Sequence, residues 1–195
     1  AFAQAIADAN PDSELTTRLD NFKRWYAQAG TPRVTARGSY DADNRIYTLT
    51  LSQRSAPTPG QPEKAPYVIP VAMGLVGRDG RQINLQLEGH LNTLGHDIVL
   101  VLSEPEQTFT FVHVPVEPVP SLLRGFSAPV VLETELGDDA LFTLLSHDLD
   151  PFNRWEAAQK LALRRILNAV HGNGHMELDA RFIEAMRGVL RHGEL

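Results

Sequence analysis

Cysteine is absent from this sequence of 195 residues, and long apolar runs and positive charge are scarce. Without cysteine the chain can form no disulfide framework, no thiolate metal site and no cysteine nucleophile. Its longest aliphatic run covers residues 98–102, whereas a membrane-spanning helix needs about 20 apolar residues. Lys and Arg number 18 against 24 Asp and Glu, and the basic residues are scattered. The sequence therefore predicts neither a membrane partner nor a nucleic-acid partner.

The start of the chain lacks targeting features. It opens on Ala1 rather than methionine, and acidic residues come early, so we expect neither a signal peptide nor an Arg-rich transit peptide. A cytoplasmic location fits the absence of cysteine. The composition, with 43% hydrophobic and 22% charged residues, is that of an ordinary globular chain. We interpret the sequence as an excised piece of a longer protein.

Helical spacing dominates the first part of the chain. Over residues 13–29, apolar residues recur every three or four positions and share one helical face: Leu15, Leu19, Phe22 and Tyr26. Gly30 offers a left-handed stop and Pro32 forbids continuation, so the helix is predicted to end there. A second helix is predicted over residues 2–9.

The apolar spacing changes from helical to alternating after Pro32. Seven segments read as strands, at 33–38, 45–53, 67–76, 82–88, 98–103, 107–114 and 128–135. Short strands separated by turn signals predict a two-sheet antiparallel sandwich of immunoglobulin or fibronectin type. Its core is expected to contain Leu49, Leu51, Ile69, Val71, Ile83, Leu85, Val99, Val101, Phe109 and Phe111.

Turn residues add detail to this prediction. The Asp79-Gly80 pair within residues 77–81 accepts positive φ and predicts a hairpin turn. Pro70 cannot donate a ladder hydrogen bond, so its strand is expected to lie at an edge or to carry a bulge. Residues 55–66 contain four prolines and little to bury, which indicates an extended surface loop.

Helical spacing returns after Leu136. Asp138 or Asp139 can cap a short helix, and Pro151 is placed to begin the next one after Asp150. The apolar residues expected on the buried face of the first helix are Leu141, Leu144 and Leu145. Those expected on the second helix are Trp155, Ala158, Ala162, Ile166 and Ala169.

A break at residues 171–174 ends the second of these helices, and a last helix is predicted from about Asp179. It carries an apolar stripe made of Phe182, Met186, Val189 and Leu190. If the helix comes from a larger helical array, this stripe would pack against helices that the chain lacks. We therefore expect the stripe to be exposed here.

A search for catalytic and metal-binding motifs begins with the zinc peptidase helix, which reads H-E-x-x-H. No histidine in this chain is followed by glutamate. His171 and His175 are four residues apart, but Gly172 and Gly174 lie between them. These glycines favour a solvated loop over a helical metal site.

Two further patterns have structural interpretations. The Gly-Phe-Ser triplet at 125–127 begins like a nucleophile elbow, but Pro129 stands where the turn needs glycine, which favours a loop. Asp148 and Asp150 resemble the start of a calcium loop that lacks its central glycine, and helix capping explains both. No phosphate-binding loop or dinucleotide motif is present. We predict no catalytic, cofactor-binding or metal-binding residue in this chain.

Basic and aromatic residues gather on the predicted helices. The basic clusters consist of Arg18, Lys23 and Arg24 on the first helix and Arg164 and Arg165 on a later one. We favour solvated faces or salt bridges at domain interfaces for these residues. Trp25 and Trp155 each follow an arginine, and we favour a core position for both over stacking on a ligand.

Six segments of the chain form an ordered series. They read FKRWYAQAGTP at 22–32, YTLTLSQ at 47–53, TPGQPEK at 58–64, EQTF at 106–109, PVPSLLRGFSAPV at 118–130 and RWEAAQ at 154–159. This series resembles bacterial aminopeptidase N, a zinc exopeptidase family of the gluzincin group. The likeness covers the chain from Phe22 to about Leu163 and fades beyond Arg165.

The resemblance implies a division into domains. In that family an N-terminal β domain and a thermolysin-like zinc domain precede a small β-sandwich and a large helical superhelix. Residues 1–32 would then be the helical tail of the zinc domain, 33–136 the sandwich and 137–195 the first helices of the superhelix. The family's zinc helix, peptide-anchoring segment and transition-state tyrosine would lie upstream of Ala1. Zinc is therefore expected in the full-length parent and not in this chain.

Three functions follow from these observations. The resemblance favours a non-catalytic spacer that orients the zinc domain and the superhelix of an enzyme that removes N-terminal amino acids from short peptides. Its partners would be the other domains of the same polypeptide. The alternative is a free-standing sandwich module for a carbohydrate or protein, which would need exposed aromatics among Tyr40, Tyr47, Phe109, Phe111 and Phe126. A metallohydrolase built from separate loops has no local motif in its favour.

Overall fold

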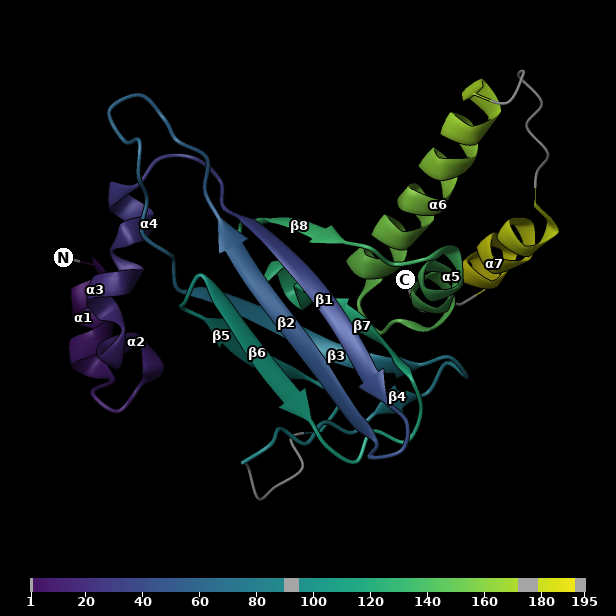
Figure 1. Ribbon diagram of the computed structural model, residues 1–195, viewed down its shortest axis with the longest axis horizontal. Coiled ribbons are helices and arrows are strands. Elements are labelled where there is room, and N and C mark those ends of the chain that lie inside the picture. The colour runs from purple at the N-terminus through teal and green to yellow at the C-terminus, as the bar shows by residue number, and fades with distance from the viewer. Residues whose placement is uncertain (1, 90–94, 172–178, 192–195) are drawn as a thin grey trace.

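The computed structural model describes residues 2–89, 95–171 and 179–191, and it shows a β-sandwich with helices at both ends (Figure 1). The strands are β1 (Arg33–Asp41), β2 (Ile46–Arg54), β3 (Ile69–Gly77), β4 (Gln82–Ile83), β5 (Ile98–Leu102), β6 (Glu106–Phe111), β7 (Pro118–Leu122) and β8 (Val131–Thr134). The helices before them are α1 (Phe2–Ala9), α2 (Glu14–Thr17), α3 (Leu19–Phe22) and α4 (Arg24–Ala27). The 3-10 turn η1 (Arg124–Phe126) precedes β8, and the last helices are α5 (Asp138–His147), α6 (Pro151–His171) and α7 (Ala180–Arg191).

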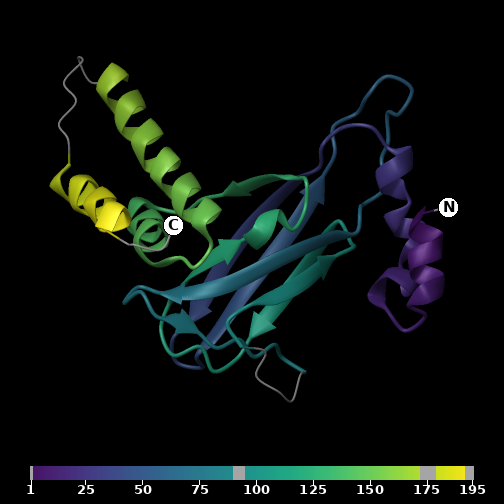
Figure 2. The same ribbon diagram turned by 180° about the vertical axis from the view of Figure 1, so that it is seen from behind.

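The strands form two four-stranded sheets. One has the order β6-β2-β1-β8, and in the other β3 pairs with β4, β5 and β7. Figure 2 shows the molecule from the side of the second sheet. Buried apolar side chains from both sheets form a single cluster between them. The predicted two-sheet sandwich is confirmed.

Alternation along the strands decides which side chains enter this core. In β2, Tyr47, Leu49 and Leu51 are buried, while the residues between them are only partly buried. Most of the expected core is confirmed, because seven of the ten residues are at most 5% exposed: Leu49, Leu51, Ile69, Val71, Ile83, Leu85 and Phe111.

The prediction for β5 is wrong by one residue. Leu100 and Leu102 are buried, whereas Val99 is 56% exposed and Val101 is only partly buried. Residues 98–102 are all aliphatic, so the run carries no alternation that could fix its register. A shift by one residue exchanges the two faces of a strand. Phe109 of β6 is also only partly buried, although it packs against the core.

Two features of the sheets differ from the sequence prediction. β7 was not predicted, because Pro118 and Pro120 interrupt its alternation, yet it pairs antiparallel with residues 73–77 of β3. β8 pairs with β1 in parallel. Among the described strand pairs this is the one exception to the antiparallel arrangement that was expected.

The turn predictions agree with the structure. Pro70 pairs with Val101 of β5, whereas β7 pairs only with residues 73–77, so Pro70 has a neighbouring strand on one side only. This part of β3 is an edge, as predicted. Gly80 in the predicted hairpin turn has a φ of +85°, a conformation that glycine adopts without strain.

The helical segment before the sandwich is interrupted. α1 covers the predicted residues 2–9, but residues 13–29 form three short pieces instead of one helix. Leu19 is buried and Phe22 packs against it, whereas Tyr26 is 69% exposed. The side chain of Leu15 lies outside the described part. Pieces of four residues are too short to be stable alone, so tertiary contacts must hold them.

The helices after the sandwich begin at Asp138 and Pro151, and the start at Pro151 is as predicted. The predicted cap of α5 is wrong, because Gly137 is its N-cap, without a side-chain hydrogen bond, and Asp138 and Asp139 lie in its first turn. The expected apolar residues of α5 are confirmed as buried: Leu141, Leu144 and Leu145. Of the stripe predicted for α6, Ala158 is buried as expected, but Trp155, for which a core position was expected, is 55% exposed and Ile166 is 49% exposed. The residues that α6 buries are Asn153, Ala157, Ala158 and Leu161.

The last helix also differs from expectation. Phe182, Met186 and Val189 pack against the apolar cluster that contains the buried leucines of α5. Only Leu190 of the predicted stripe is left in solvent, with 79% of its area exposed. Most of this stripe therefore already has a partner within the chain, and the predicted exposure is wrong for those three residues.

Candidate functional site

The residues that the motif search considered do not come together in the structure. Ser127 Oγ accepts a hydrogen bond from the Ala72 backbone N–H at 2.9 Å, so it completes the edge of β3. His171 is the last residue of α6, and His175 lies outside the described residues. Within the described part of the chain, no three His, Cys, Asp or Glu side chains are placed to hold a metal ion. None of the helices described there is long and apolar enough to cross a membrane.

Polar side chains gather instead where the helices meet the sandwich, and the larger cluster surrounds Arg124, which is 8% exposed. Its Nε donates to Ser121 Oγ at 2.7 Å, and its Nη1 donates to Asp97 Oδ1 at 2.5 Å. Nη2 donates to Gln82 Oε1 at 3.2 Å and to Asp148 Oδ1 at 3.1 Å. We call these five side chains the Arg124 joint. It ties the sandwich to the link between α5 and α6, because Asp148 lies in that link.

The link between α5 and α6 is built around this joint. Asp148 has no exposed side-chain area, and its Oδ1 also accepts the Asp150 backbone N–H at 3.0 Å. Asp150 caps α6, since its Oδ1 accepts the Asn153 backbone N–H at 2.9 Å. Its Oδ2 accepts the Gly125 backbone N–H from η1 at 2.8 Å. Capping therefore explains Asp150 as predicted, whereas Asp148 chiefly serves as the anionic partner of Arg124.

Asn153 extends the joint into the first turn of α6. Its buried Nδ2 donates to Ser121 Oγ at 2.9 Å and to the Leu122 carbonyl at 3.0 Å. Gly74 of β3 makes room for the guanidinium, because a Cβ there would lie 2.2 Å from Arg124 Nη1. Buried charge pairs add little net stability but are strongly destabilising when one partner is removed. This joint is thus suited to favouring a single orientation of the helices on the sandwich.

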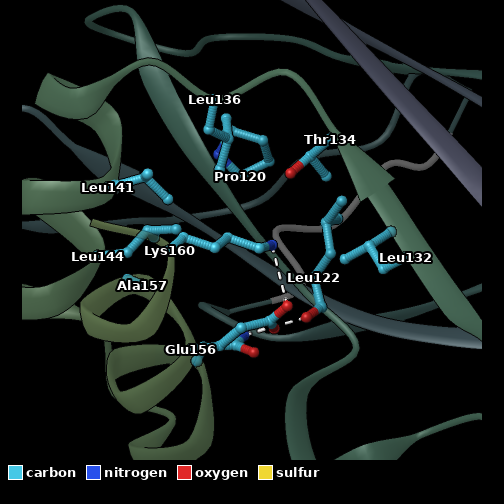
Figure 3. A pocket seen from close by; sticks show the side chains of 11 residues that line it. Pro120, Leu122, Leu132, Thr134, Leu136, Leu141, Leu144, Glu156, Ala157 and Lys160 are labelled. Carbon is cyan, nitrogen blue, oxygen red and sulfur yellow. Dashed lines mark hydrogen bonds and ion pairs between the residues drawn. The ribbon is translucent and has the colours of Figure 1, made fainter. Parts of the chain in front are cut away.

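Apolar contacts surround the polar joint. Val76 and Val119 of the sandwich share one cluster with residues of the helices: Leu141, Leu145 and Leu161. Figure 3 shows the neighbouring contact of β7 and β8 with α5 and α6, where a cavity of ≈ 30 Å³ remains. That volume has room for about one or two water molecules, so no larger ligand fits. The Glu156 and Lys160 side chains, paired at 2.9 Å, lie beside it.

A second joint lies at the other end of the sandwich, between α4 and the proline-rich loop. Trp25 packs on Tyr67 with ring centroids 4.4 Å apart, and its indole N–H donates to the Val68 carbonyl at 2.9 Å. Gln28 exchanges two hydrogen bonds with the Ala65 backbone, at 3.0 and 2.7 Å. The predicted surface loop is therefore also the surface on which α4 docks, and the partly buried position of Trp25 agrees with the core interpretation.

Arginines of the helices take part in these interfaces, which supports the interface role considered for the basic clusters. Arg24 Nη1 donates to the Pro66 carbonyl at 2.5 Å. Arg165 donates to Asp179 Oδ2 at 2.6 Å, and its guanidinium lies 5.2 Å from the centre of the Phe182 ring. The hydrogen bond from Arg165 lowers the pKa of the Asp179 carboxyl. Arg165 thereby connects α6 to the start of α7.

The hydroxyl of Tyr47 is a buried polar group outside both joints. Tyr47 is 3% exposed, and its hydroxyl has no hydrogen-bond partner among the described residues. Burial raises the pKa of Tyr47, and the negative charge of Glu117 raises it further. The hydroxyl lies against Gly38, where a Cβ would come within 2.2 Å of its oxygen. An unpaired buried hydroxyl costs stability, so this group identifies a weak point of the core.

Two known protein families match this chain. Residues 30–135 match DUF3458, described as a domain of unknown function with an Ig-like fold. The chain belongs to the DUF3458 family. Residues 138–195 match DUF3458_C, described as a domain of unknown function made of ARM repeats. The DUF3458 match contains all eight described strands, and the ARM-repeat match contains α5, α6 and α7.

Curated relatives named aminopeptidase N are similar to nearly the whole chain. The relative from Escherichia coli K12 is 43% identical over 193 residues, that from Haemophilus influenzae 36% over 179, and that from Caulobacter vibrioides 41% over 168. These alignments cover 97%, 90% and 86% of this chain but only 21%, 20% and 18% of the relatives. This DUF3458 chain thus spans about a fifth of their length.

A solved structure agrees with this relationship. The crystal structure of Legionella pneumophila aminopeptidase A in complex with aspartic acid superimposes with a TM-score of 0.77 at 26% sequence identity. The superposition covers 100% of this chain and 20% of that one. The resemblance to a segment of bacterial aminopeptidase N is therefore confirmed.

Proposed function

We propose that this chain is a non-catalytic segment of a zinc-dependent aminopeptidase N, in which the sandwich connects and orients the catalytic domain and the C-terminal helical domain. The observation that carries the proposal is that the helices at each end of the sandwich are held by a joint, α4 through Trp25 and the link between α5 and α6 through Arg124. The two groups of helices lie at opposite ends of the sandwich (Figure 1). The similarity to about a fifth of each aminopeptidase N relative supports it. Residues 1–32 would belong to the catalytic domain and residues 137–195 to the helical domain.

The two joints have the chemistry that a fixed orientation requires. Rotation of the helices at the Arg124 joint would leave the buried Asp148 carboxylate without its cation, which is costly. Movement of α4 would break the hydrogen bond donated by Trp25 and the two hydrogen bonds between Gln28 and the Ala65 backbone. The sandwich would thus hold the zinc domain and the helical domain at a set separation. The zinc domain and the helical domain would enclose a chamber that admits short peptides. The partners of the sandwich would be these two domains of the same polypeptide.

The test compares the purified 195-residue chain with the full-length parent. The chain alone should retain no stoichiometric zinc by elemental analysis and should not hydrolyse aminoacyl chromogenic substrates, because metal-dependent hydrolysis needs protein ligands and a base. The full-length parent should retain zinc and should hydrolyse these substrates. One zinc per chain together with chelator-sensitive turnover of the 195-residue chain would overturn the proposal.

The alternative, a free-standing binding module, has less support. Tyr47 and Phe111 are buried, and Tyr40 and Phe109 pack against the core. Only Phe126 among the five aromatic residues considered is exposed, at 67%, and it lies on η1 instead of on a sheet face. These five residues therefore do not form an aromatic platform for a carbohydrate.

A further inference from the structure

Strand β1 extends beyond the strand that lies beside it. β8 pairs in parallel with residues 33–36 of β1, whereas residues 37–41 have β2 on one side and no described strand on the other. In Figure 1, β8 accompanies only the first part of β1. Residues 37–41 are therefore an open edge of the sheet, and we call them the β1 edge.

The backbone of the β1 edge directs unpaired hydrogen-bonding groups away from the sheet. The Pro32 carbonyl accepts the Val131 N–H of β8 at 3.0 Å, so the backbone of Pro32 faces β8. Alternate residues of a strand direct their N–H and C=O groups to the same edge. Gly38 and Tyr40 therefore direct theirs to the side of β8, beyond its last residue. Among the described residues, these groups have no partner.

Other edges of the sandwich are protected from pairing. β7 carries Pro118 and Pro120, which have no N–H to donate, and Ser127 Oγ accepts the Ala72 N–H at the edge of β3. The β1 edge contains no proline, and its two inward-facing residues are uncharged. An open edge of this kind is a template on which another extended chain can pair.

A cavity of ≈ 450 Å³ lies beside the β1 edge. Its other walls come from residues 117–120, which lead into β7, and from residues 134–137, which lead into α5. The lining includes the apolar side chains of Leu49, Val119 and Leu136. Sites that bind small ligands commonly have volumes of about 300–1,000 Å³. Room for a ligand is thus available next to the backbone groups that lack partners.

The Tyr47 ring explains why residue 38 is a glycine. A Cβ at Gly38 would lie 2.2 Å from the Tyr47 hydroxyl oxygen, so no larger residue fits while the ring is in place. Both residues line the cavity, and position 38 presents bare backbone to it. Glycine inside a strand is a feature of sites where a ligand or another backbone approaches closely.

We propose that the β1 edge binds a short peptide in extended conformation, which lies in the cavity and pairs with Gly38 and Tyr40. These two residues offer two N–H donors and two C=O acceptors, and an extended peptide presents matching groups along its own edge. Apolar side chains of the peptide would face Val119 and Leu136, and polar ones would face Arg37 and solvent. This inference goes beyond the proposed orienting role and does not depend on it.

The space beside the β1 edge selects a short peptide over a folded protein. Residues 37–41 span about 16 Å at roughly 3.3 Å per residue, the length of a short strand. A helix is about 10–12 Å wide, and a folded partner's next strand would lie only about 4.8 Å beyond the docked one. Because residues 117–120 and 134–137 also line the cavity, its ≈ 450 Å³ leaves room for one strand without its sheet.

Amide hydrogen exchange, followed by NMR on the isotope-labelled 195-residue chain, tests the proposal residue by residue. The probe is a five-residue peptide that alternates valine and threonine and is blocked at both ends. With the peptide in millimolar excess, the Gly38 and Tyr40 amides should exchange at least about tenfold more slowly. The Arg37 and Ser39 amides face β2 and are the control, because they should be protected with and without peptide. Unchanged exchange at Gly38 and Tyr40 would overturn the proposal.

A pair of methylated peptides tests whether the backbone makes the contact. A strand presents alternate amides to each of its edges, so only one alternate set of the peptide's amides can pair with β1. N-methylation of that set should abolish the protection of Gly38 and Tyr40, and N-methylation of the other set should preserve it. Equal protection by both methylated peptides would show that strand pairing is not the mode of binding.

Two matched variants test the cavity. Thr134→Trp and Val131→Trp each add a large ring to β8, but only Thr134 lines the cavity. Thr134→Trp should fill part of this space and weaken binding of the peptide several-fold, and Val131→Trp should leave binding unchanged. The protection of Arg37 and Ser39 shows whether each variant is folded. Equal affinities of two folded variants would contradict the assignment of the cavity.

Two further outcomes would assign the β1 edge to another occupant, and each would overturn the peptide site. Protection of Gly38 and Tyr40 that grows with the concentration of the chain, without peptide, would identify a second copy. Protection already present in the full-length parent, without peptide, would identify another segment of the same polypeptide. None of these measurements depends on zinc or turnover, so the proposed function is tested separately.

Discussion

Replacing Arg124 with methionine removes the cation of the Arg124 joint while keeping a long, unbranched side chain in its place. The Asp148 side chain is wholly buried, and its Oδ1 receives a hydrogen bond from the guanidinium at 3.1 Å. In the variant that carboxylate stays buried without its partner, and Ser121 and Gln82 each lose a donor. Breaking a buried ion pair in this way costs roughly 3–5 kcal/mol. The free energy of unfolding should therefore fall by about that amount.

Urea unfolding of a double-mutant cycle measures this cost. Arg124→Met, Asp148→Asn and the double variant should show a coupling energy of about 1–3 kcal/mol, because the double variant leaves no unpaired buried carboxylate. Asp97, the other carboxylate partner of Arg124, is 66% exposed and stays hydrated. Arg78→Met is the matched control, since Arg78 is 58% exposed and pairs with Glu117 at 2.8 Å. An exposed pair of this kind is worth only about 0–1 kcal/mol. The account of the joint is refuted if Arg124→Met lowers the free energy of unfolding no more than Arg78→Met does. It is also refuted if the losses of free energy caused by Arg124→Met and Asp148→Asn simply add in the double variant.

Three other substitutions test separate parts of the structure. Gly74→Ala would place a Cβ 2.2 Å from Arg124 Nη1, and thermal unfolding should show a loss of about 1–3 kcal/mol; an unchanged melting temperature would contradict the packing. Tyr47→Phe removes a buried hydroxyl that has no partner among the described residues, and should raise the free energy of unfolding by up to about 1 kcal/mol. Because burial raises the pKa of Tyr47, the unfolded chain releases this proton first. The stability of the wild type should therefore fall as pH rises above about 10, and Tyr47→Phe should flatten that slope; the same slope in both proteins would refute this. Gln28→Ala removes two hydrogen bonds to Ala65 and should make α4 more sensitive to limited proteolysis, and unchanged cleavage would show that the loop does not hold this helix.

The sequence predicts those elements whose signals are local. The beginning of α6 follows from Asp150 and Pro151, a cap and a first-turn proline that act within a few residues. The hairpin turn follows from Gly80, whose positive φ the Asp-Gly pair predicted. Strand β2 follows from its clean alternation, because every second residue faces the core.

The sequence does not predict features that depend on contacts between distant residues. Three of the four partners of Arg124 are 24 to 42 positions away, so no local pattern marks this residue. The aliphatic run of β5 carries no alternation that could choose its buried face. The stripe predicted on α6 has the right period, but its two large residues, Trp155 and Ile166, face solvent while Ala158 is buried. A helix that is apolar on two faces does not show which one its neighbours cover.

The most direct test of the orienting role is the size selectivity of the full-length parent with and without Arg124→Met. If the joint holds the helical domain over the catalytic domain, loosening it should widen the chamber. We predict that kcat/KM for longer peptides rises relative to that for a small aminoacyl chromogenic substrate, while one zinc remains bound. An unchanged ratio in a variant whose joint is shown to be weakened, or an equal loss on both substrates, would contradict the account.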